Sequence, residues 1–184
     1  MIKKLSSTTV YQNKWLSVRE DKVMFDNKFE GIYSVLDKPD CVMIMPYDGE
    51  FFYLVRQYRY PIEKYFLEFP AGSHEESTIE NEVQLVKDEL EEETGWVSEK
   101  ITKLGVLNEV PATVNQRCHM FLAENLRHGQ QKLEVTESDL TIIKMTQSEL
   151  ETAIANGKVS DAKTLAGFLI WKLKKQLNDA DIKS

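Results

Sequence analysis

An acidic stretch in the middle of the chain has residue types and spacing that suit metal chemistry. Residues 88–93 include five carboxylates, and Gly95 follows, where a glycine usually marks the end of a helix. Carboxylates in a last turn oppose the helix macrodipole, at a cost of about 0.3–1 kcal/mol each. Glu92 and Glu93 come three and four residues after Glu89, so all three share one helix face. A hard divalent cation such as Mg²⁺ takes oxygen ligands and would turn this repulsion into coordination. The alternative is a solvated acidic face that binds no metal.

The helix that must carry these acids is expected to start near Thr78, which is the predicted N-cap. Glu80 and Glu82 would then lie in the first turns, where the dipole favours acids. Apolar residues recur at helical spacing and predict a buried stripe on another face, made of Ile79, Val83, Val86 and Leu90.

Other charged residues stand just before this helix. Arg56 and Arg59 lie near the end of a predicted strand and are candidates for bidentate phosphate binding; the alternative is two surface arginines on an edge strand. Glu68 lies between aromatic and aliphatic neighbours, where a charge needs a partner. A turn over residues 70–72 separates it from the helix.

Composition limits the class of protein. The 184 residues carry a net charge of −7 without a block of lysine or arginine, which argues against nucleic-acid binding by a basic surface. No apolar run reaches the length of a membrane span, and the first residues lack the apolar core of a signal peptide. Cys41 and Cys118 form neither a disulfide framework nor a zinc spacing. We therefore expect a cytoplasmic protein.

The order of the predicted elements indicates an α+β fold. Residues 8–36 alternate as strands do, with turns expected at Asp26-Asn27 and Glu30-Gly31. The run at 41–45 is apolar throughout and predicts a strand covered on both faces. Two helices are expected to close the chain, one over 147–155 and one from about residue 160, ahead of a frayed tail at 179–184. The last helix has a predicted apolar stripe of Leu165, Phe168, Leu169, Leu173 and Leu177.

The acidic stretch resembles the signature of the Nudix hydrolases, G-x5-E-x7-R-E-U-x-E-E-x-G-U, where U is a bulky apolar residue. The spacing from Glu80 to Trp96 matches it. The loop after Gly72 is two residues longer than the pattern, Asp88 stands where the family has arginine, and Ile79 stands where it has a second glycine. Further segments look like the ADP-ribose pyrophosphatase branch, which includes GDP-sugar hydrolases: Tyr11-x-Asn13-x-Trp15-Leu16-x-Val18, Val55-Arg56-Gln57-Tyr58-Arg59, Glu68-x-Pro70-Ala71-Gly72, Asn115-Gln116-Arg117, Phe121-Leu122-Ala123 and Gly157…Asp161-Ala162.

The resemblance implies a Nudix fold, a mixed β-sheet sandwiched between helices, with an N-terminal β extension. We expect one domain over 1–184, divided into an extension at 1–38, a core at 39–178 and the tail. Branch members are usually homodimers in which the N-terminal strands contribute to the partner's substrate site. Carried over by position, Glu89 and Glu93 would be the principal metal ligands, with help from Glu92 and the backbone carbonyl of Ala71. Glu68 would lie in the metal shell or directly behind it. Arg56 and Arg59 would contact the phosphates of the substrate.

The implied reaction is Mg²⁺-dependent hydrolysis, with Mn²⁺ as a possible substitute, of the pyrophosphate bond in a nucleoside diphosphate sugar such as ADP-ribose. A glutamate on the loop before the last core strand serves as general base in the branch, and Glu137 fits best, with Glu134 and Asp139 as alternatives. The base of the nucleotide would stack on an aromatic side chain, for which Trp15 and Tyr11 are the candidates.

Asp88 leaves alternatives open. An aspartate beside the box glutamates raises their pKa values by repulsion, unless a metal or the neighbouring Lys87 offsets it. A catalytically weak or inactive Nudix-fold module that binds a nucleotide sugar is therefore the second hypothesis. An acidic protein-interaction surface without metal is the third.

Overall fold

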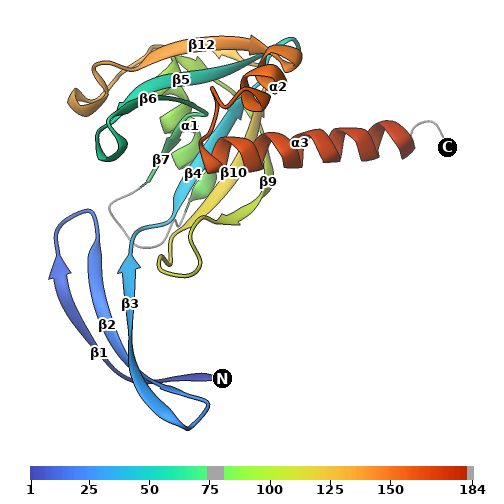
Figure 1. Ribbon diagram of the computed structural model, residues 1–184. Helices are drawn as coiled ribbons and strands as arrows, with labels where there is room; N and C mark the ends of the chain where they lie inside the picture. Colours follow the sequence, from blue (N-terminus) through green and yellow to red (C-terminus); the bar gives the residue numbers. More distant parts are fainter. Residues whose placement is uncertain (74–80, 182–184) are drawn as a thin grey trace.

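The computed structural model describes residues 1–73 and 81–181 (Figure 1). Among the described residues, no helix is both long and apolar enough to cross a membrane. The elements follow in the order β1 (Ile2–Gln12), β2 (Ser17–Phe25), β3 (Phe29–Asp37), β4 (Cys41–Pro46), β5 (Phe51–Arg59), β6 (Lys64–Glu68), β7 (Ala71–Gly72), α1 (Glu82–Thr94), β8 (Trp96–Val97), β9 (Lys100–Asn108), β10 (Arg117–Glu124), β11 (Arg127–His128), β12 (Thr141–Thr146), α2 (Gln147–Ala155) and α3 (Ala162–Asp181).

The central sheet has the strand order β7-β4-β10-β9, in which β4 and β10 run parallel and the other pairs run antiparallel. Every residue of β4 is buried, which confirms the prediction of a strand covered on both faces. Its side chains alternate between two hydrophobic cores. Cys41, Met43 and Met45 belong to one core, and Val42 and Ile44 belong to the other. The sheet is therefore a mixed sheet between helices, as expected.

One core lies against α3 and the other against α1. On the α3 side, Phe168 and Trp171 pack edge-on against Phe52, with ring centroids 5.7 and 4.8 Å away. On the α1 side, Val86 and Leu90 are fully buried against the central sheet. Full burial of each such side chain contributes about 1.5–3 kcal/mol, so packing fixes the rotation of α1 about its axis. That rotation decides where its glutamates point.

A second sheet, β12-β5-β6, carries the predicted phosphate-binding arginines. β5 follows β4 through a tight turn at Gly49, whose φ is 105°. β4 and β5 belong to separate sheets, and an isolated bridge joins Tyr47, just after β4, to Phe52 of β5. β6 ends at Glu68, three residues before the start of β7, which is part of the central sheet.

The N-terminal strands β1, β2 and β3 form their own antiparallel sheet, which extends away from the rest of the chain (Figure 1). Every residue of β1 is exposed. The predicted turn at Asp26-Asn27 is confirmed, with both residues at positive φ. The turn predicted at Glu30-Gly31 is wrong, because both residues pair with β2 inside β3.

Several predicted boundaries need correction. α2 matches its predicted range and is capped by Thr146 and Glu149 in a capping box. α1 begins later than expected: Asn81 accepts a hydrogen bond from the Gln84 amide and is the N-cap. The expected cap Thr78, with Ile79 and Glu80, lies outside the described residues, and Val83 of the predicted stripe is 45% exposed.

The C-terminal helix also differs from its prediction. α3 continues to Asp181, so residues 179–181 of the expected frayed tail are helical. Phe168 of the predicted apolar stripe is buried in the core, Leu165 packs against the core, and Trp171, which the stripe did not include, is buried as well. Leu169, Leu173 and Leu177 of the stripe are exposed. The C-terminal part of α3 extends past the sheets (Figure 1).

Candidate active site

The helix α1 places the box glutamates against the strand β7. Gly95 ends the helix in the left-handed conformation, at φ 68°, and its amide donates to Glu91 O at 2.8 Å, which confirms the predicted C-cap. Because Val86 and Leu90 face the core, the neighbouring face carries Glu89 and Glu93 toward the Pro-Ala-Gly turn. Glu93 is only 3% exposed, which is rare for a carboxylate without a cation.

Two close contacts hold these carboxylates. Glu93 Oε2 accepts a hydrogen bond from the Ala71 amide at 3.3 Å. The carboxylate of Glu89 occupies the space beside Gly72: a Cβ at that position would lie 1.9 Å from Glu89 Oε1 and 2.0 Å from Glu89 Cδ. A side chain at position 72 is therefore incompatible with the observed position of Glu89. This contact explains sterically why a glycine is needed at this position of the motif.

Burial and mutual repulsion raise the pKa values of the clustered acids. Burial, then the charges of Glu137 and Glu92, raise the pKa of Glu89 to about 7. Burial, then Glu89 and Glu137, hold the pKa of Glu93 well above its usual range. Burial, then Asp88, also raise the pKa of Glu92. Such a cluster has too few cations of its own, so a divalent cation among these oxygens would remove a repulsion that already exists.

The carboxylates surround the space beside β7 without meeting at one point. Within residues 1–73 and 81–181, only Cys41, Glu109 and Cys118 form a group of three potential ligands whose donor atoms all lie within 4.8 Å of one another. The structure therefore does not show the expected convergence of Glu89, Glu92 and Glu93 on one point.

The loop after β11 is fastened to the C-terminal end of α1. The Gly129 amide donates to Gly95 O at 2.8 Å, and the Lys132 amide donates to Glu92 O at 3.0 Å. Gln131 Nε2 donates to Glu93 O at 2.7 Å. These bonds satisfy carbonyl groups that the end of a helix leaves unpaired. They also fix the start of the loop that carries the candidate general bases.

Among those candidates, Glu137 has an electrostatic effect on all three box acids. After burial, its charge contributes to the raised pKa values of Glu89, Glu92 and Glu93, whereas the charge of Glu134 contributes to those of Glu89 and Glu92. Asp139 instead accepts a hydrogen bond from the Tyr58 amide at 3.0 Å and anchors the loop to β5. Glu134 forms a capping box with Glu137 around a short 3-10 turn.

The residue in place of the box arginine has a local partner. Asp88 accepts a hydrogen bond from Gln84 Nε2 at 2.8 Å. Lys87, the expected substitute cation, is paired with Glu99 at 2.6 Å and points elsewhere. Lys132 instead lowers the pKa of Glu92, against the raising effects of burial and Asp88. Lys132 was not among the residues predicted from the sequence. The feature that could have indicated it is that it is a single lysine in a loop whose other charged residues are acidic.

Glu68 has the partner that its apolar neighbours required. Arg59 Nε donates to Glu68 Oε1 at 2.7 Å, and Glu68 is 2% exposed. Burial and Glu89 raise the pKa of Glu93, and the charge of Arg59 partly offsets that rise, so Arg59 belongs to the same group of charges. The strand register places Arg56 on the opposite face of the hairpin, where its guanidinium lies 3.7 Å from the ring centroid of Tyr65. The structure thus brings Arg59, and not Arg56, to the box acids.

The candidate stacking residues lie on the N-terminal extension. Trp15 is 56% exposed, with Lys14 Nζ 3.9 Å from its ring centroid, and Tyr11 is exposed as well. Trp15 lines a hollow of ≈ 350 Å³ between the extension and the core, together with Asp40 and Arg117. This hollow contains no box acid, so Trp15 does not reach the acid cluster of its own chain.

The chain is similar in sequence and in fold to known nucleotide-sugar hydrolases. Residues 2–36 match the family model described as the nucleoside diphosphate sugar hydrolase N-terminal domain. The chain is 27% identical over 177 residues to an ADP-ribose pyrophosphatase of Bacillus subtilis (strain 168), and 24% identical over 177 residues to a methanol dehydrogenase activator of Bacillus methanolicus; each alignment covers 95% of both proteins. A crystal structure of an ADP compounds hydrolase has the same fold, with a TM-score of 0.81 at 20% identity over 95% of both chains.

The N-terminal match, the two full-length relatives and the shared fold thus agree with the acid-bearing helix, and together they support the resemblance to the Nudix hydrolases of the ADP-ribose pyrophosphatase branch.

Proposed function

We propose that the protein is a Mg²⁺-dependent hydrolase that cleaves the pyrophosphate bond of a nucleoside diphosphate sugar such as ADP-ribose. The products would be a nucleoside monophosphate and a sugar phosphate. The observation that carries the proposal is the half-buried Glu89 next to the buried Glu93 beside β7, where burial and then repulsion raise both pKa values. The names of the relatives, which include an ADP-ribose pyrophosphatase, support the same substrate class.

The donor set fits a hard divalent cation. Glu89 and Glu93 would be the principal ligands, Glu92 would assist, and Ala71 would contribute its carbonyl. The oxygen-only character of this set favours Mg²⁺ or Mn²⁺ over softer metals. When bound, the metal would neutralise phosphate charge and acidify a water molecule. Glu68 would act from behind this shell, since its carboxylate is already held by Arg59.

The remaining residues would manage charge and proton transfer. Water would attack one phosphorus of the diphosphate, and Glu137 would accept its proton as general base. Glu137 suits this role because its charge acts on all three box glutamates and its loop is hydrogen-bonded to the end of α1. Arg59 adds a cation at the base of the site, and Lys132 beside Glu92 would take over part of the charge balance that the family's arginine supplies.

We also propose a homodimer. The extension exposes large apolar side chains on a thin, three-stranded sheet, including Trp15 at 56% and Ile32 at 63%. Three strands with so little apolar burial need another surface to cover them. A partner's extension would bring Trp15 near the acid cluster that it does not reach in its own chain. The two free thiols suit a reducing compartment such as the cytoplasm.

A substrate panel tests the activity. ADP-ribose, GDP-mannose and related compounds would be incubated with the protein and Mg²⁺ or Mn²⁺, and the release of monophosphate measured. We expect turnover that is abolished by Glu93→Gln and retained by Glu99→Gln, because Glu99 is an exposed acid paired only with Lys87. Asp88 favours one alternative, a module that binds a nucleotide sugar without cleaving it. Ligand binding with no turnover in either metal would establish that alternative.

A further inference from the structure

Two buried thiols face each other away from the acid cluster. Cys41 begins β4 and Cys118 lies at the start of β10, and the two residues are directly opposed in the parallel register. Both side chains belong to the core on the α3 side of the central sheet, whereas the box glutamates come from α1 on the other side. Cys118 is fully buried and Cys41 is 8% exposed. These two are the only cysteines in the chain.

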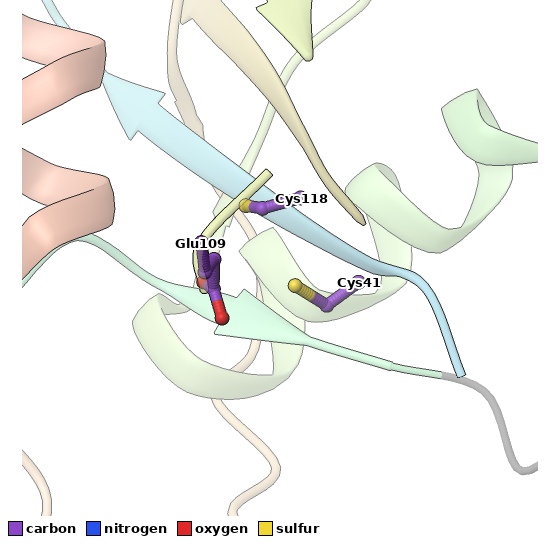
Figure 2. Close-up of side chains that lie close together, drawn as sticks. All are labelled: Cys41, Glu109 and Cys118. Carbon is purple, nitrogen blue, oxygen red and sulfur yellow. The ribbon is translucent and has the colours of Figure 1, made fainter. Parts of the chain in front are cut away.

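A carboxylate completes the group. Glu109 follows β9, and its side chain lies close to the two cysteine side chains (Figure 2). Its buried Oε1 has no hydrogen-bond partner within the part of the chain that the structure describes. Lys163 Nζ at the start of α3 is 3.8 Å away, too far for a hydrogen bond and shared with Asp161 at 3.5 Å. An acceptor oxygen buried beside two thiols without a donor calls for a positively charged partner.

The dimensions suit a tetrahedral metal ion. The two sulfur atoms and a Glu109 oxygen all lie within 4.8 Å of one another. Zn–S bonds of about 2.3 Å and Zn–O bonds of about 2.0–2.2 Å at tetrahedral angles separate the ligand atoms by roughly 3.5–3.8 Å. Small side-chain rotations would therefore bring all three atoms to one ion. Three protein ligands leave a fourth position for water.

We propose that Cys41, Cys118 and Glu109 form a second metal site, which takes a thiolate-preferring divalent cation such as Zn²⁺. Two thiolates and a carboxylate carry a charge of −3, so a dication leaves −1, and Lys163, which also pairs with Asp161, offsets part of that charge. The two thiol protons go to solvent when the metal binds. The sulfur ligands separate this site from the oxygen-only acid cluster, which holds Mg²⁺ or Mn²⁺. A cross-strand disulfide would leave the Glu109 oxygen unpartnered, so the geometry favours the metal.

Cobalt absorption tests the site directly. The reduced full-length protein would be titrated with Co²⁺ under nitrogen, and the thiolate-to-cobalt charge-transfer band in the near ultraviolet recorded. We expect a band that saturates at one thiolate-bound metal per chain and disappears when Zn²⁺ is added. Cobalt held by the acid cluster gives no such band, since that cluster contains no sulfur.

Variants separate the two sites. Cys118→Ser should abolish the band while Mg²⁺-dependent hydrolysis continues. Glu109→Gln keeps both thiols and should weaken Co²⁺ binding by at least about tenfold. Glu93→Gln should leave the band unchanged.

Four results would overturn the proposal: no band in the reduced protein, a band that survives Cys118→Ser, unchanged affinity in Glu109→Gln, or loss of both free thiols without bound metal, which means a disulfide. Circular dichroism checks that each variant is folded. If Cys118→Ser does not fold, Glu109→Gln still tests the proposal.

Discussion

The contact between Gly72 and Glu89 allows a sharp prediction. A methyl group introduced by Gly72→Ala would lie 1.9 Å from Glu89 Oε1. An ordinary contact needs about 3.4 Å, so the carboxylate must move by more than about 1 Å. Gly72 does not have a positive φ, so alanine fits the backbone and the strain falls on a side chain that can rotate away. We therefore expect a change of less than about 1 kcal/mol in the free energy of unfolding.

Activity should respond far more strongly than stability. Misplacing a catalytic group by about 1 Å can cost about 100-fold in rate. Mg²⁺ titrations of the hydrolysis rate should show a fall of this order in kcat/KM and a higher Mg²⁺ concentration at half-maximal rate. Gly105→Ala is the matched control, because the nearest atom to a Cβ there is 3.7 Å away, and it should keep near-normal activity. A Gly72→Ala protein with unchanged rate and Mg²⁺ requirement would refute the assignment of Glu89 as a metal ligand.

Four further predictions address the general base, the buried charge, the substitute cation and the extension. Glu137→Gln should lower kcat by about 10²–10⁴-fold with little change in KM, as expected for a general base, in steady-state assays. The pKa of Glu89 is raised from 4.5 to about 7, so the metal-free protein should lose stability as pH rises through this range, and thermal melts should show a flatter pH dependence in Glu89→Gln. Lys132→Met should raise the Mg²⁺ requirement, whereas Lys87→Met should not, because Lys87 pairs with an exposed acid. Ile32→Asp should produce monomers in analytical ultracentrifugation and lower activity; a fully active monomer would contradict the dimer proposal.

Local sequence patterns were enough to predict the helix that carries the acids. The spacing of the acids and Gly95 predicted the end of α1 and the shared face of its glutamates, because both follow from helix geometry within one segment. Period-two alternation already separates residues three apart on a strand, so the sequence alone could have indicated that Arg56 and Arg59 face opposite ways.

Other features depend on contacts between distant segments. The role proposed for Lys132 depends on the hydrogen bonds between its loop and the end of α1. No pattern within the loop sequence indicates these bonds. The leucines of α3 have the spacing of a buried stripe, but periodicity does not tell where the supporting sheet ends. The pairing of Cys41 with Cys118 required the register of two strands that are far apart in sequence.

The most direct test of the account is anomalous diffraction from crystals grown with Mn²⁺ and a non-hydrolysable ADP-ribose analogue. We expect an anomalous peak from a manganese ion between the carboxylates of Glu89 and Glu93, in contact with the diphosphate of the analogue. Glutamate side chains turned into solvent, with no manganese bound among them, would contradict it.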